Sequence, residues 1–122
     1  MTHQILFVSN SPDLRQSVYP DLIKDGYQIL ETTSGQETLS MMADLSELEL
    51  LLIDASLQNM DAIQLARQIR SISNYRFLPI IMLVSKRSKA LEAEGRTAGI
   101  TGWINQPVIP LHLRMIIHRL LG

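Results

Sequence analysis

The sequence predicts an α/β fold, a (βα)5 doubly wound sheet of five parallel strands in the order 2-1-3-4-5 with helices on both faces. Strand-like apolar runs and helix-like stretches alternate five times along the 122 residues, which is typical of such a sheet. The run Leu50-Leu51-Leu52-Ile53 is continuously aliphatic, as expected for a strand that is buried on both faces. Right-handed crossovers leave few topologies, and this strand order is the common one.

The expected strands are short and mostly aliphatic. They are predicted at residues 5–8, 27–32, 50–53, 79–84 and 102–105. Asp54 then follows the central strand, just past its carboxyl end. In open α/β sheets ligands and chemistry collect at this edge, so Asp54 is the first candidate for a functional residue.

The expected helices carry apolar residues at spacings of three and four. They are predicted at residues 12–25, 34–44, 63–72, 90–98 and 110–121. Pro20 is expected to kink or weaken the second half of the first helix, and Asp61 is expected to cap the third. The residues predicted to face inward include Leu14, Val18 and Leu22 in the first helix, Leu39, Met42 and Ala43 in the second, and Leu113, Ile116, Ile117 and Leu120 in the last.

Composition narrows the function classes. With 11 basic and 12 acidic residues the net charge is -1, which gives no electrostatic argument for binding nucleic acid or an anionic membrane. The chain has no cysteine, so disulfides and thiolate metal sites are excluded. No apolar run approaches the ~18 residues of a membrane span, and the start lacks a signal-peptide pattern. We therefore expect one cytoplasmic domain over residues 1–122.

Five segments resemble the receiver domain of two-component response regulators, in particular chemotaxis receivers. Residues 5–12, ILFVSNSP, resemble the opening strand, where two acids normally precede Ser-Pro. Residues 52–54, LID, and 60–62, MDA, resemble the phospho-acceptor strand and its Met-Asp-Gly loop. Residues 79–86, PIIMLVSK, and 99–107, GITGWINQP, resemble the fourth strand and the segment that carries an aromatic residue and Lys-Pro. The resemblance implies a flavodoxin-like three-layer sandwich.

The family resemblance also implies a phosphorylation site. In active receivers an acidic pair and the acceptor aspartate bind Mg²⁺, whose preferred ligands are such oxygens. A Thr or Ser hydroxyl and a Lys ammonium then hold the new phosphate, and an aromatic ring changes rotamer. Phosphoryl transfer depends mostly on positioning and on neutralising oxygen charge. In this sequence Asp54 falls on the acceptor position and Trp103 on the aromatic position.

The remaining pocket positions depart from the family pattern. The acidic pair falls on Ser9 and Asn10, the hydroxyl position on Val84 and the Lys position on Gln106. Val has the shape of Thr without its hydroxyl, and Gln keeps a donor without the charge. The resemblance therefore implies a degenerate pocket, a pseudo-receiver. Its only expected metal site is a weak Mg²⁺ site at Asn10, Asp54 and Ser56.

Three functions follow from these features. The first is a non-enzymatic interaction module that binds a protein partner, or a second copy, through the face formed by residues 90–121. On this face Leu111, Met115 and Ile117 do not all fit one inward stripe, so some apolar surface is expected to be exposed for association. The second is a working phospho-acceptor that takes phosphate on Asp54 from a histidine kinase. The third, a flavodoxin-like cofactor binder, is disfavoured because the segment SNSPD at residues 9–13 has no glycine and carries an acid.

Overall fold

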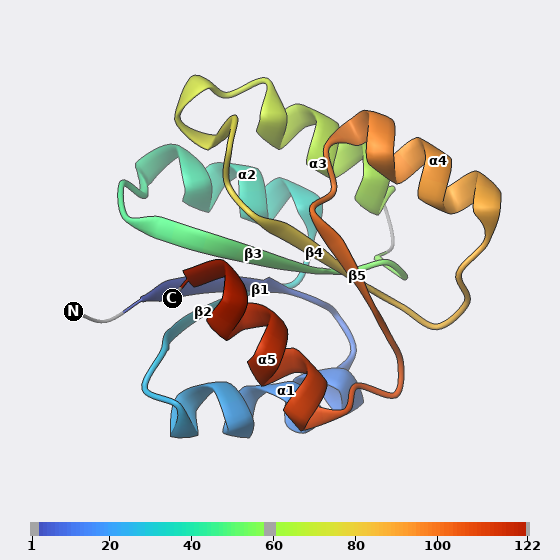
Figure 1. Cartoon of the computed structure of the whole chain (residues 1–122). Helices are drawn as coiled ribbons and strands as arrows, with labels where there is room; N and C mark the ends of the chain where they lie inside the picture. Colours follow the sequence, from blue (N-terminus) through green and yellow to red (C-terminus); the bar gives the residue numbers. More distant parts are fainter. Residues whose placement is uncertain (1–2, 58–60, 122) are drawn as a thin grey trace.

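The computed structural model describes residues 3–57 and 61–121 and contains the expected parallel sheet (Figure 1). The strand order is β2-β1-β3-β4-β5, and each neighbouring pair is parallel. β3 lies at the centre of the sheet, between β1 and β4. The strands are β1 (Gln4–Val8), β2 (Gln28–Thr32), β3 (Leu48–Asp54), β4 (Ile80–Val84) and β5 (Gly102–Asn105).

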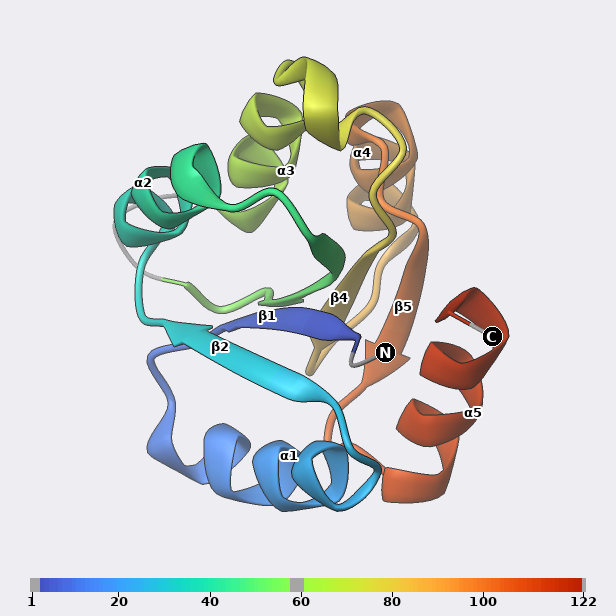
Figure 2. The same ribbon diagram turned by 90° about the vertical axis from the view of Figure 1, so that its left-hand side faces the viewer.

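Helices cover both faces of the sheet, which gives three layers (Figure 2). α1 and α5 lie on one face, and α2, α3 and α4 lie on the other. Each crossover between parallel strands therefore contains one helix, as the alternating sequence predicts. The helices are α1 (Pro12–Lys24), α2 (Gly35–Asp44), α3 (Ala62–Arg70), α4 (Lys89–Ala98) and α5 (Pro110–Leu121), with a short 3-10 turn, η1, at Ser73–Tyr75.

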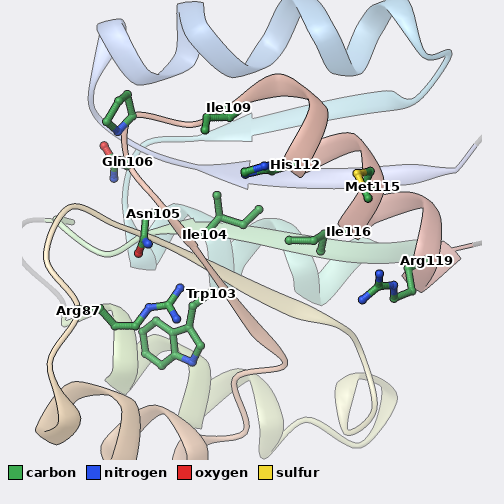
Figure 3. Close-up of a pocket in the computed structure, with 11 residues that line it drawn as sticks. Arg87, Trp103, Ile104, Asn105, Gln106, Ile109, His112, Met115, Ile116 and Arg119 are labelled. Carbon is green, nitrogen blue, oxygen red and sulfur yellow. The ribbon is translucent and has the colours of Figure 1, made fainter.

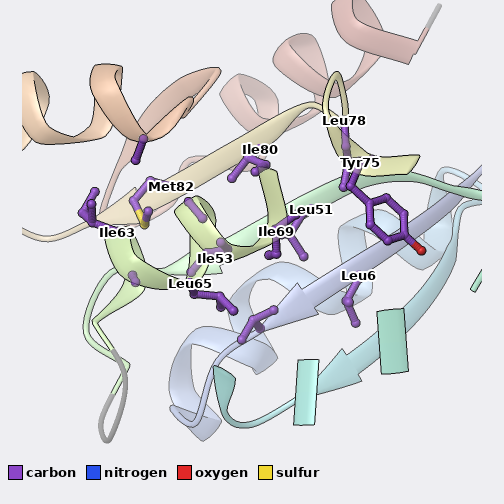
Figure 4. Packing of buried hydrophobic residues seen from close by; sticks show 14 of the residues in the cluster. Leu6, Leu51, Ile53, Ile63, Leu65, Ile69, Tyr75, Leu78, Ile80 and Met82 are labelled. Carbon is purple, nitrogen blue, oxygen red and sulfur yellow. The ribbon is translucent and has the colours of Figure 1, made fainter. Parts of the chain in front are cut away.

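The sheet separates two apolar cores because successive side chains of a strand point to opposite faces. Leu51 and Ile53 face α2, α3 and α4 (Figure 4), whereas Leu50 and Leu52 face α1 and α5. All four side chains are fully buried. The prediction of a strand buried on both faces is confirmed, and Asp54 is the last residue of this strand rather than the residue after it.

Several details differ from the sequence predictions. α1 continues without interruption past Pro20, since the burial of Val18 and Leu22 on either side of the proline stabilises its second half. Ala43 is exposed because the inward face of α2 is formed by Gly35, Thr38 and Met42.

In α5 the inward stripe contains Leu113 and Ile117, while Ile116 is half-buried and Leu111 and Met115 are exposed. The prediction that Leu113 and Ile117 face inward is confirmed. Met60, part of one quoted segment, lies outside the described residues.

Asp61 caps α3, as predicted. Its carboxylate accepts a hydrogen bond of 2.9 Å from the backbone N–H of Ile63, one of the donors that a helix start leaves unpaired. We expect Asp61→Ala to lower the free energy of unfolding by about 1 kcal/mol. Urea denaturation measures this change. Asp61→Asn, which keeps the accepting oxygen, is the control and should recover most of the lost stability; equal losses in both variants would contradict the capping role.

Candidate functional site

The register of the sheet brings the candidate residues to one edge. Val8 of β1 pairs with Ile53 of β3, and Asp54 pairs with Leu83 of β4. Val84 in turn pairs with Asn105 of β5. Asp54 and Val84 end their strands, and Ser9 and Gln106 directly follow theirs. These four residues therefore lie at the carboxyl edge of the sheet, where open α/β sheets carry their chemistry.

Asp54 is completely buried, and both of its carboxylate oxygens accept hydrogen bonds. The Ser9 hydroxyl donates to Oδ2 at 2.8 Å. The Ser56 backbone N–H and hydroxyl donate to Oδ1 at 3.0 and 2.7 Å. Hydrogen bonds to a charged acceptor stabilise a fold more than neutral ones do. The carboxylate thus joins the end of β1 to the turn after β3.

The sequence places Ser9 at the acidic-pair position but does not predict its contact with Asp54. The Ser9 side chain is fully buried. The hydroxyl donates to Asp54 and accepts a 3.0 Å hydrogen bond from the Ser11 N–H, while the Ser9 carbonyl accepts from the Arg15 guanidinium. The position of Ser9 could have indicated this contact, because Ser9 directly follows a buried strand that neighbours the strand ending at Asp54.

The other predicted pocket residues lie at this edge without contributing charge. Val84 is 1% exposed and packs in the core between the sheet and α2, α3 and α4. The Gln106 side chain donates a 3.3 Å hydrogen bond to the Leu83 carbonyl rather than to Asp54. Asn10 is exposed and lines a shallow depression together with Pro12, Arg15 and Thr33. Ser85, the hydroxyl residue that follows Val84, is exposed.

These donors do not fit Mg²⁺, the ion that the resemblance implies. Mg²⁺ binds proteins through carboxylates in near-ideal octahedral geometry, and the one carboxylate here already accepts hydrogen bonds on both oxygens. Residues 3–57 and 61–121 contain no group of three or more His, Cys, Asp or Glu side chains that could hold a metal ion. The misfit is the lack of further carboxylates beside Asp54 among the described residues, since Oδ2 accepts only one hydrogen bond and keeps a lone pair.

A second feature is a groove of about 520 Å³ on the surface of β5 and α5 (Figure 3). Its apolar lining includes Trp103, Ile104 and Met115, and Arg87 and Arg119 lie at its margins. No Asp or Glu is among the lining residues that the structure describes. Trp103 is half-buried and packs against the core beneath α4. The groove lies on the face formed by residues 90–121, where the sequence predicts exposed apolar residues on the last helix.

Arg70, the last residue of α3, holds the end of α4 in place beside this groove. The Arg70 guanidinium donates to the Gly99 carbonyl at the end of α4, at 2.6 and 3.1 Å, and to the Tyr75 carbonyl at 2.9 Å. Burial lowers the pKa of Arg70. Because these carbonyls are the last groups of their helical turns, the cation satisfies acceptors that the backbone leaves unpaired.

Comparison with known proteins agrees with this geometry. The model of the response regulator receiver domain family matches residues 5–118. The chain belongs to this family. The receiver superposes on the structure of the chemotaxis response regulator CheY4 of Vibrio cholerae with a TM-score of 0.92 and 28% identity, covering 99% of this chain and 100% of that one. The flavodoxin-like fold is thereby confirmed.

Two curated relatives show the contexts in which similar receivers occur. Chemotaxis protein CheY1 of Helicobacter pylori is 27% identical over 120 residues, which cover 98% of this chain and 97% of that protein. Transcriptional regulatory protein SrrA of Staphylococcus aureus is 28% identical over 121 residues, 99% of this chain and 48% of that protein. This chain is therefore a receiver domain of two-component signalling. None of its described helices is long and apolar enough to cross a membrane.

Proposed function

We propose that residues 1–122 form an atypical receiver domain that acts by binding a protein partner and does not use Asp54 as a phospho-acceptor. The observation that carries this proposal is the complete burial of Asp54 together with hydrogen bonds on both carboxylate oxygens. A nucleophilic carboxylate needs one oxygen free to approach phosphorus in line with the leaving group. Here hydrogen bonds from Ser9 and Ser56 fill three of the roughly four lone-pair positions of the Asp54 carboxylate.

The electrostatics of the pocket support the same proposal. The positions that supply acids, a hydroxyl and an ammonium in an active receiver are Ser9, Asn10, Val84 and Gln106. Each lost charge-assisted contact removes roughly 1.5–3 kcal/mol of stabilisation from a phosphoryl group. Loss of two such contacts slows transfer by roughly 10²- to 10⁴-fold, since each 1.4 kcal/mol is a factor of ten.

The groove on β5 and α5 is the proposed partner site. Its apolar floor and its margin of Arg87 and Arg119 match the composition of protein interfaces, where aromatic residues, Met and Arg are enriched. Leu111 and Met115 extend the apolar surface along α5, at 61% and 52% exposure. Exposed apolar patches of this kind mark association sites. The partner is a protein of the signalling pathway, and a homodimer through the same face is the alternative.

Incubation with a small phosphodonor tests the proposal. The purified chain is exposed to acetyl phosphate and Mg²⁺, and its intact mass is recorded at intervals. We expect no increase by the mass of a phosphoryl group, while a receiver with the full set of pocket residues becomes labelled in a parallel reaction. An adduct on this chain that disappears in Asp54→Asn would contradict the proposal and favour the working phospho-acceptor.

A further inference from the structure

Gly95 lies in the middle of α4, directly beneath the indole ring of Trp103. A Cβ atom added at Gly95 would lie 2.3 Å from Cζ2 and 2.7 Å from Cη2 of that ring. Real Cβ atoms do not approach carbon this closely, because optimal contact between carbons is about 3.5–4.0 Å. The ring therefore occupies space that any other residue at position 95 would fill. Glycine inside a helix normally destabilises it, so this position requires a specific reason.

The contact couples α4 to the groove. Trp103 lines the groove on one side, together with Ile104 and Met115, and on the other side it lines a smaller depression with Glu92 and Arg96 of α4. Figure 3 shows the indole extending from β5 toward the helix below it, beside the Arg87 side chain. The Trp103 ring thus forms the boundary between the groove and the surface of α4.

We propose that Gly95 is a positioning residue that holds the Trp103 ring in a single orientation, so that the partner groove keeps one shape whatever the state of Asp54. This inference rests on the proposed function, because it explains how the partner face is maintained without a phosphorylation signal. The ring packs on the backbone of α4 at Gly95 and against the core residues beneath that helix.

Fluorescence tests the contact directly, since Trp103 is the only tryptophan in the sequence. Gly95→Ala forces the ring away from α4, so its emission shifts to longer wavelength and acrylamide quenches it more strongly than in the wild type. Thr97→Ala, on the exposed side of the same helix, is the matched control and leaves both quantities unchanged. Unaltered emission and quenching in Gly95→Ala would overturn the proposal.

A double-variant cycle separates this contact from a general effect on the helix. In the Trp103→Leu background the two clashing ring atoms are absent, so Gly95→Ala raises the melting temperature, as alanine does in an ordinary helix interior. In the wild-type background the same substitution lowers it. A rise of equal size in both backgrounds would show that the ring does not use the glycine and would overturn the proposal.

Beryllofluoride, a phosphoryl mimic, distinguishes failure of this inference from failure of the proposed function. With Mg²⁺ and beryllofluoride, wild-type emission stays unchanged if the ring is held in one orientation. Fluorine NMR reports separately whether the mimic binds. Binding without any change at Trp103 contradicts the proposed function and leaves the role of Gly95 intact. Binding with a shift of Trp103 emission overturns the single orientation.

Discussion

Asp54→Ala should lower the free energy of unfolding by about 3 kcal/mol. The substitution removes the acceptor of three hydrogen bonds, from the Ser9 hydroxyl and from the backbone N–H and hydroxyl of Ser56. The fully buried Ser9 hydroxyl would be left without an acceptor, which costs roughly 1–3 kcal/mol, whereas the exposed Ser56 can turn to water. Chemical denaturation followed by circular dichroism measures the change.

Two variants serve as controls for this prediction. Ser9→Ala removes one of the three hydrogen bonds and should cost less than Asp54→Ala. Asp44→Ala removes an exposed acid at the end of α2 and should change stability by less than about 0.5 kcal/mol. An increase in stability in Asp54→Ala would contradict the account. That result is expected for an aspartate placed in a repulsive acidic cluster, not for one that holds two strand ends together.

Restoring the family pattern should convert the pocket into an Mg²⁺-dependent one. The quadruple variant Ser9→Asp, Asn10→Asp, Val84→Thr and Gln106→Lys supplies the acids, hydroxyl and ammonium that the resemblance places there. Without a cation, the buried carboxylate at position 9 repels Asp54, and the variant is less stable than the wild type. Mg²⁺ should then raise its stability, by about 2.7 kcal/mol at a concentration one hundred times its Kd. Labelling by acetyl phosphate should increase by roughly 10²-fold or more.

Thermal unfolding with and without Mg²⁺ provides the measurement, and labelling provides the second readout. The wild type should show the same melting temperature in both solutions, because its donor set does not fit the ion. Adding Asp54→Asn to the quadruple variant should abolish labelling while leaving its four substitutions in place. If the quadruple variant neither responds to Mg²⁺ nor gains labelling, the four substituted positions do not explain the loss of phosphorylation chemistry.

The fold could be predicted because its determinants are local and repetitive. Continuous aliphatic runs such as residues 50–53 identify buried parallel strands, and spacing of four identifies helix faces such as that of α1. The errors occurred where tertiary contacts override the local pattern. Pro20 sits in an uninterrupted helix because the neighbouring side chains are buried. Tyr75 lies between the helix predicted at residues 63–72 and the strand predicted at 79–84; it is buried in η1, where its hydroxyl donates to the Met42 carbonyl.

The candidate site was only partly predictable. Strand ends placed Asp54, Val84 and Gln106 at one edge, which the register confirms. Sequence spacing alone could not reveal that Ser9 donates to Asp54, since these residues are 45 positions apart. Nor could it reveal why α4 contains Gly95, because the reason is a ring on another strand. Residue types indicate which chemistry is missing, whereas the replacement contacts depend on the three-dimensional arrangement.

Amide NMR of the ¹⁵N-labelled chain, titrated with Mg²⁺ and then with beryllofluoride, tests whether Asp54 still operates as a phosphorylation switch. We expect that the resonances of Asp54, Val84 and Trp103 do not move at Mg²⁺ concentrations up to tens of millimolar, nor when beryllofluoride is added. Saturable shifts that cluster at these three residues would contradict this expectation. They would show that the serine donors yield to a cation and a phosphoryl mimic, and that Asp54 still operates as the switch of a receiver.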